Sequence, residues 1–371
     1  MRLDAFTKRV MRKNKSNQSR LPLTISAQYG LVDQIKFFNK VVASTDLSNY
    51  YLLKKGEFAY NKSYSSDYPW GAIKRLDNYD QGALSSLYIC FAPQDNVVSD
   101  FILQYFESPK WHKGISEIAV EGARNHGLLN VAVQDFFHTY HYVPKDKKEQ
   151  IKISKLLMLL DERIVTQNKI IEDLKKLKSA IIEKLYKEIQ GTWYSYRQLF
   201  SIINERNKQL EYSNVLSASQ ERGMVSREDL NLDIHFERSN ISTYKIVKNG
   251  DYVIHLRSFQ GGFAFSEQTG ICSPAYTVLR PNNLLVYGYL SNYFTSRGFV
   301  KSLIIVTYGI RDGRSINVDE WLDMKVVIPS KEQQTHIINV IESIENKIKN
   351  EETYSNCLLN QKQYLLRQMF I

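Results

Sequence analysis

The chain repeats itself, and the repeat lies in segments with the pattern of long helices. Two stretches, 150–186 and 334–370, align without a gap at one constant spacing, that between Ile153 and Ile337. Apolar residues recur in both at alternate steps of four and three, which is typical of a helix that packs along a second helix. Polar residues interrupt the pattern, and they repeat too, Gln167 against Glu351 and Lys178 against Lys362. The predicted seam consists of Ile153, Leu157, Leu160, Ile164, Leu174, Ile181, Leu185, Ile337, Ile341, Ile344, Ile348, Leu358, Leu365 and Met369.

Proline and glycine mark the boundaries of these helices. Neither residue occurs from Lys145 to Gln190, and Pro329 precedes a second stretch that also lacks both. An unbroken helix over the first stretch would extend roughly 60–70 Å. We therefore predict four segments, namely a globular domain, a long helix, a second globular domain and a second long helix, at 1–143, 144–191, 192–328 and 329–371.

The two globular domains also match each other, more weakly. Lys13-Asn-Lys15 corresponds to Arg206-Asn-Lys208, and Gly122-Ala-Arg124 corresponds to Gly309-Ile-Arg311. Short apolar runs separated by turn signals, with some helix between them, predict a mixed α/β (α+β) domain. We therefore expect one scaffold, present twice, with different side chains around it.

The two long helices most simply pair with each other. An antiparallel pair places the end of the first helix beside the start of the second, so that a compact second domain can connect them. The prediction is thus an antiparallel coiled coil with pseudo-twofold symmetry. The alternative is that each helix packs only on its own domain.

Charge and composition indicate the kind of partner. The net charge is +10 and the pI about 9.2, which favours a polyanion such as nucleic acid. The three cysteines lie far apart, and no apolar run approaches the length of a membrane span. We therefore expect a cytoplasmic protein.

No catalytic motif stands out. The sequence lacks a phosphate-binding loop and a dinucleotide-binding fingerprint. It also has no adjacent pair of prolines, so the Asn-Pro-Pro-[Tyr/Phe] motif of adenine methyltransferases is absent. His138 and His141 have a spacing that metal sites use, but no further ligand accompanies them, so no metal site is predicted. Glu345 and Lys347 are interpreted as a solvated pair on a helix.

The chain resembles the specificity (S) subunit of type I restriction–modification enzymes. The resemblance lies in the first long helix, 153–186, in the similar helix starts at Pro144 and Pro329, and in the order of two domains that are each followed by a helix. It covers essentially the whole chain. It implies a non-enzymatic reader of a bipartite, asymmetric DNA site, with one target-recognition domain per half-site and the helix pair setting the gap.

The resemblance also implies partners. Two methyltransferase subunits would join the chain to modify DNA, and motor-nuclease subunits would join for restriction. S-adenosylmethionine, ATP and magnesium would belong to those partners, so no cofactor is expected on this chain. Two other classes remain open: a free-standing regulator that binds duplex DNA, and an adaptor that uses its coiled coil to join proteins.

Polar and basic residues near the predicted strands are the candidates for DNA contact. Amide side chains suit adenine edges, arginine suits guanine, and lysine suits phosphates. The candidates are Lys13, Lys15, Tyr60, Asn61, Lys62, Lys74, Arg75 and Arg124 in the first domain, and Arg206, Lys208, His255, Arg257, Gln260, Arg311 and Arg314 in the second.

Overall fold

The structure, a computed structural model, describes residues 1–119, 127–219, 222–230, 238–255, 262–308 and 315–370. The chain forms two compact units, each made of one globular domain and part of each long helix. Unit 1 contains residues 1–168 and 353–371, and unit 2 contains residues 169–352.

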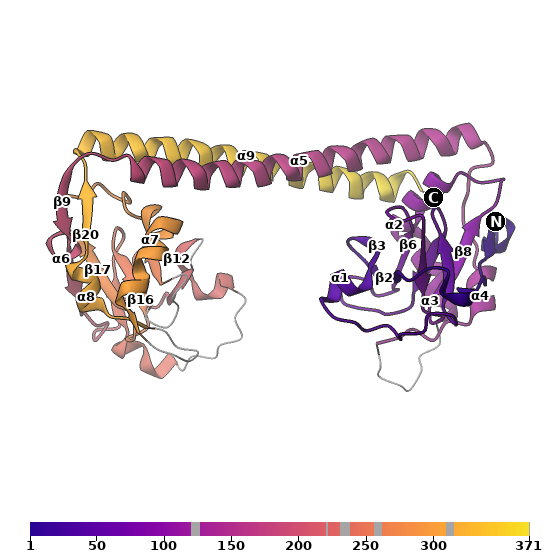
Figure 1. The fold of residues 1–371 in the computed structure, drawn as a ribbon, viewed down its shortest axis with the longest axis horizontal. Helices are drawn as coiled ribbons and strands as arrows, with labels where there is room; N and C mark the ends of the chain where they lie inside the picture. Colours follow the sequence, from indigo (N-terminus) through magenta and orange to yellow (C-terminus); the bar gives the residue numbers. More distant parts are fainter. Residues whose placement is uncertain (120–126, 220–221, 231–237, 256–261, 309–314, 371) are drawn as a thin grey trace. The chain divides into compact units, whose positions relative to one another are not determined.

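The two long helices are α5, Lys147–Lys187, and α9, Lys331–Gln368 (Figure 1). Each begins a few residues after a proline, which cannot donate a backbone hydrogen bond and so suits the start of a helix. None of the described helices combines the length and apolarity needed to cross a membrane.

The domain of unit 1 is built on two four-stranded sheets, with strand orders β1-β8-β5-β6 and β3-β2-β7-β4. All pairs are antiparallel except β2 with β7. The strands are β1 (Thr7–Arg9), β2 (Pro22–Ser26), β3 (Gly30–Asp33), β4 (Tyr51–Lys54), β5 (Phe58–Asn61), β6 (Ala72–Arg75), β7 (Gln81–Leu84) and β8 (Ile89–Pro93). The helices are α1 (Gln34–Phe38), α2 (Ser99–Glu107), α3 (His112–Ile118) and α4 (Val133–His138).

The domain of unit 2 contains a four-stranded antiparallel sheet of order β10-β17-β14-β15 and several two-stranded pairs. Its strands are β9 (Thr192–Ser195), β10 (Phe200–Ile203), β11 (Leu216–Ser219), β12 (Gly223–Ser226), β13 (Lys245–Val247), β14 (Tyr252–Ile254), β15 (Phe263–Phe265), β16 (Gly270–Cys272), β17 (Thr277–Pro281), β18 (Thr307–Tyr308), β19 (Ser315–Ile316) and β20 (Lys325–Ile328). Its helices are α6 (Tyr196–Leu199), α7 (Arg297–Ser302) and α8 (Val318–Asp323).

The main sheets of the two domains have the same register. Thr7 of β1 faces Pro93 of β8, and Phe200 of β10 faces Pro281 of β17. The next strand continues the match, because β5 pairs with β8 and with β6 just as β14 pairs with β17 and with β15. The scaffold is therefore duplicated, as the weak sequence repeat predicts.

Each domain core includes side chains from both long helices. In unit 1, Leu157 of α5 and Leu366 of α9 are buried in the main aromatic cluster. In unit 2, Ile182 of α5 and Ile337 of α9 are buried in the equivalent cluster, which includes the stacked rings of Tyr196 and Trp321. Packing of the helices on the domains therefore contributes to stability in both units.

The helix segments also contact each other within each unit. In unit 1, Asp161 of α5 meets Lys362 of α9, and further along α5, Asn168 meets Ser355. Residue numbers that rise along α5 meet numbers that fall along α9, so the segments run antiparallel. In unit 2, Lys175 meets Glu352 and, further along α5, Lys178 meets Glu345, which is the same antiparallel order.

Every side chain of the predicted seam is buried or half-buried. Some buried helix positions outside the predicted seam come in equivalent pairs of the repeat, such as Ile171 with Ser355 and Ile182 with Leu366. The buried stripe is thus wider than an alternation of three and four residues provides, because the helices pack on a domain as well as on each other.

Candidate nucleic-acid interface

The hairpin of β5 and β6 in unit 1, with its loop 62–71, contains most first-domain candidates, namely Tyr60, Asn61, Lys62, Lys74 and Arg75. Gly71 closes this loop with a φ of +76°, and a Cβ there would lie 2.1 Å from the backbone oxygen of Asn61. Only glycine fits both the left-handed backbone and the close approach. The sequence therefore forces the chain to double back directly beside Asn61.

A second segment holds the outer part of this loop. The N–H of Tyr64 donates to the Gly127 carbonyl at 3.0 Å, and the N–H of Leu129 donates to the Lys62 carbonyl at 2.9 Å. These bonds place the chain just after 120–126 against the loop. Arg124 itself lies in that range and outside the described residues.

Asn61 and Lys62 are half-buried at the base of the loop. The Asn61 Oδ1 accepts the Ser63 N–H at 3.0 Å, which fixes the orientation of the amide. Among the described residues, none forms an ion pair with Lys62. The Asn61 amide nitrogen and the Lys62 ammonium are thus donors held on an ordered loop, which suits contact with base edges or phosphates.

Lys74 and Arg75 are held by carboxylates of the same domain. The Lys74 Nζ lies 2.6 Å from Glu107, and Arg75 lies 2.7 Å from both Asp77 and Asp100. Their side chains are only 12% and 11% exposed. Both residues fasten the edge strand β6 to neighbouring segments, so their charges are already balanced within the domain.

The prediction that Tyr60 contacts DNA conflicts with the structure. Its side chain is 0% exposed and stacks on Phe136, with the ring centroids 5.0 Å apart. The hydroxyl donates to the Trp70 carbonyl at 2.9 Å, and burial raises the pKa of Tyr60. The residue supports the loop from below because β5 is buried on both of its faces.

Lys13 and Lys15 flank a buried asparagine, as Arg206 and Lys208 do in the second domain. Asn14 is 0% exposed, and its amide donates to the Ser19 carbonyl at 2.8 Å. The equivalent Asn207 donates in the same way to a carbonyl five residues further on. The repeated tripeptide is therefore a structural turn, and its flanking cations are displayed on the surface.

The Lys13 ammonium donates to the Asn49 carbonyl at 2.8 Å and lies 4.4 Å from the Tyr51 ring centroid. Lys15, Arg206 and Lys208 are exposed. These three side chains point toward solvent on turns of fixed geometry, which suits contacts with a phosphate backbone.

In the second domain, the structure places one of the loop candidates, His255. This residue follows β14, its N–H donates to the Gly262 carbonyl at 2.6 Å, and its ring meets the edge of Tyr276 at 5.0 Å. Arg257, Gln260, Arg311 and Arg314 lie outside the described residues.

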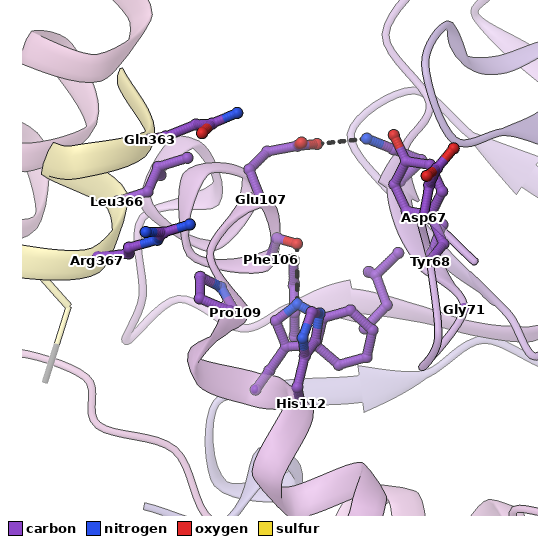
Figure 2. Close-up of a pocket in the computed structure, with 14 residues that line it drawn as sticks. Asp67, Tyr68, Gly71, Phe106, Glu107, Pro109, His112, Gln363, Leu366 and Arg367 are labelled. Carbon is purple, nitrogen blue, oxygen red and sulfur yellow. Dashed lines mark hydrogen bonds and ion pairs between the residues drawn. The ribbon is translucent and has the colours of Figure 1, made fainter. Parts of the chain in front are cut away.

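A small hollow lies beside β6 in unit 1, under the C-terminal part of α9. Its volume is about 240 Å³, and Figure 2 shows Glu107, His112 and Arg367 around it. Small-molecule sites usually measure roughly 300–1,000 Å³. Burial lowers the pKa of His112. Of the polar groups around the hollow, Glu107 is already paired with Lys74, and Arg367 is exposed to solvent.

The glutamines that join the long helices to the domains were not predicted from the sequence. Gln150, 1% exposed, accepts the Val98 N–H at 2.7 Å and donates to the Pro144 carbonyl at 2.7 Å. Gln334 accepts the Val286 N–H in the same way at 2.8 Å. Gln150 and Gln334 occupy equivalent positions in the two copies of the repeat, and this equivalence is the sequence signal that could have identified them.

Three solved structures share this fold over nearly the whole chain. One is a chain from a study of complex assembly and conformational transition in the type I R-M system, with a TM-score of 0.64, 13% identity and coverage of 99% of this chain and 96% of that one. The HsdS subunit from Thermoanaerobacter tengcongensis gives a TM-score of 0.50 and 15% identity, covering 100% of this chain and 95% of its own. The type I S subunit from M. genitalium gives 0.50 and 13%, with coverage of 100% and 95%.

Identities this low show a common fold, a mixed α/β arrangement with two long helices. No protein-family model matches the sequence, and no curated protein matches it.

Proposed function

We propose that this protein is the DNA-specificity subunit of a type I restriction–modification complex. The observation that carries the proposal is the agreement of the whole fold with two S subunits, across both domains and both long helices. The duplicated sheet register and the net charge of +10 support it. One scaffold in two copies with different surfaces suits a reader of a two-part site.

In this proposal each domain reads one half-site. Asn61 and Lys62 contact DNA from the first domain, with Lys15 on the backbone. In the second domain His255, Arg257 and Gln260 belong to the reading loop, and Arg206 and Lys208 contact the backbone. Arg124 and Arg311 are proposed as backbone contacts, and Arg314 as a further DNA contact. Lys74 and Arg75 support the first loop through their ion pairs.

The long helices act as the spacer. We propose that α5 and α9 form an antiparallel coiled coil with pseudo-twofold symmetry along their full length. An α-helix of 41 residues extends about 60 Å, enough to hold two reading domains roughly one turn of B-DNA or more apart. The gap between the half-sites would then follow from the helix pair.

The protein itself is proposed to be non-catalytic and cytoplasmic. Methylation and cleavage would be carried out by two methyltransferase subunits and by motor-nuclease subunits, which would also bind S-adenosylmethionine, ATP and magnesium. One of the matching structures comes from a study of complex assembly in such a system, which supports this view of the partners.

A domain exchange tests the proposal. Residues 192–327 are replaced by the equivalent segment of a related protein, and the methylated sites of cells carrying the hybrid are mapped. We expect one half-site to change while the other half-site and the gap stay the same. Simultaneous change of both half-sites would contradict independent reading by the two domains.

A further inference from the structure

Asp161 joins three helices of unit 1. Its Oδ1 accepts from the Lys362 ammonium at 2.5 Å, and its Oδ2 accepts from the Gln104 amide at 2.9 Å. Asp161 lies on α5, Lys362 on α9 and Gln104 on α2. Gln104 is 2% exposed and the Lys362 side chain 17%, whereas the Asp161 side chain is 36% exposed, so the cluster is partly shielded from water.

The repeat builds the same ion pair a second time, in unit 2. Glu345 occupies the position of Asp161 in the second copy, and Lys178 occupies that of Lys362. The Lys178 ammonium lies 2.6 Å from Glu345. The carboxylate is now on α9 and the lysine on α5, so each long helix supplies one acid and one base.

The apolar seam alone permits more than one register. Because its pattern recurs every seven residues, sliding one helix by seven keeps apolar side chains in the seam. Such a slide in one direction brings Glu345 to Ile171 and Asp161 to Ser355. The opposite slide brings Glu345 to Leu185 and Asp161 to Met369. Either slide separates both ion pairs. It leaves Lys362 and Lys178, whose side chains are 17% and 26% exposed, without their carboxylates, which is unfavourable.

We propose that Asp161–Lys362 and Glu345–Lys178 are positioning pairs that select the register of α5 on α9. The two pairs obey the same relation between residue numbers as the contact of Asn168 with Ser355, so all three specify one register. The consequence for DNA rests on the proposed function: the register fixes the gap between the half-sites.

The register can be measured without DNA. The Asn168 Oδ1 accepts from the Ser355 hydroxyl at 2.9 Å, so cysteines at these two positions are close enough to be joined by a short thiol crosslinker only in this register. Cys357 is exposed and is first replaced by serine, whereas Cys90 and Cys272 are buried. The yield of the internal crosslink in the full-length protein reports the register.

Charge reversal and charge exchange give the decisive comparison. The double variant Asp161→Lys with Glu345→Lys sets lysine against lysine at both places, and we expect its crosslink yield to fall about tenfold. The fourfold variant that adds Lys362→Asp and Lys178→Glu restores opposite charges, and we expect it to recover the native yield. The milder pair Asp161→Asn with Glu345→Gln should give an intermediate loss, and it keeps the test informative if the reversed protein does not fold.

A matched control is the Lys175–Glu352 pair of unit 2. It joins the same helices at 2.7 Å, but its lysine is 58% exposed whereas Lys178 is 26% exposed, and the pair has no counterpart in the repeat. Lys175→Glu should leave the crosslink unchanged. An undiminished crosslink in the reversed and neutral variants, or no recovery in the exchanged one, overturns the proposal and assigns the register to domain packing.

Site mapping in cells separates this inference from the proposed function. If the complex methylates DNA, the reversed variant should alter the gap and the exchanged variant should restore it. If neither the native protein nor any variant directs methylation, the proposed function fails. The crosslink still shows whether the ion pairs select the register. A native gap in a reversed variant whose crosslink is lost contradicts the link between register and gap.

Discussion

Replacing Gln334 by leucine should destabilise unit 2 without changing its surface. Gln334 is 1% exposed at the start of α9. Its Oε1 accepts the Val286 N–H at 2.8 Å, and its Nε2 donates to the carbonyls of Leu284 and Pro329, both at 3.0 Å. Leucine has nearly the same size but leaves all three backbone groups without this partner.

The magnitude follows from those three groups. A buried polar group that loses its partner costs roughly 1–3 kcal/mol, and the apolar side chain returns part of that. We expect a net loss of about 3 kcal/mol in the free energy of unfolding. For a unit of this size that corresponds to a fall in melting temperature of about 6–12 °C. Gln150→Leu affects fewer backbone groups, so a smaller loss is expected in unit 1.

The assay is thermal unfolding followed by circular dichroism, with hydrogen exchange to identify the unit that opens. The control is Gln333→Leu, the same substitution at the exposed neighbouring position. Its melting temperature should stay within about 2 °C of the native value. An equally small change for Gln334→Leu would refute the assignment of Gln334 as the link between α9 and its domain.

Three further outcomes are expected. Gly71→Ala should cost about 1–3 kcal/mol in unfolding free energy, because its Cβ would meet the Asn61 backbone oxygen at 2.1 Å; an unchanged urea midpoint contradicts this. Burial, followed by the charge of the N-terminus, lowers the pKa of His141 to about 4 from 6.5. Between pH 6.5 and 4 the unfolded state binds a proton on this histidine that the folded state does not bind. The free energy of unfolding should therefore fall by up to about 3 kcal/mol as the pH drops from 6.5 to 4. In urea titrations, His141→Gln should reduce this dependence on pH. Lys62→Ala should weaken DNA binding and, if Lys62 contacts a phosphate, lower the salt slope by about 1; unchanged binding would remove Lys62 from the interface.

The long helices were predictable because their signal is local and occurs twice. The alternation from Ile153 onward and the prolines before each helix suffice to place α5 and α9. The polar links were harder to predict, although they were also repeated. Asp161 and Glu345 stand at equivalent positions, yet only the fold shows that each faces a lysine of the other helix.

At the candidate site, the sequence does not show which side chains are buried or already paired within the domain. Tyr60 adjoins a polar loop in the sequence, but both faces of β5 are buried and its ring lies in the core. Lys74 and Arg75 looked available because their partners Glu107 and Asp100 lie on α2, well separated in sequence. Composition alone cannot distinguish a cation that is balanced within the domain from one displayed to a partner.

Mapping of methylated DNA in the source cell, with and without this gene, tests the central claim most directly. The proposal predicts a methylated motif with two specific parts separated by a fixed gap, present with the gene and lost without it. Restoring the gene should restore the motif. An identical set of methylated sites in both cells, with the partner subunits expressed, would contradict a role as the DNA-specificity subunit.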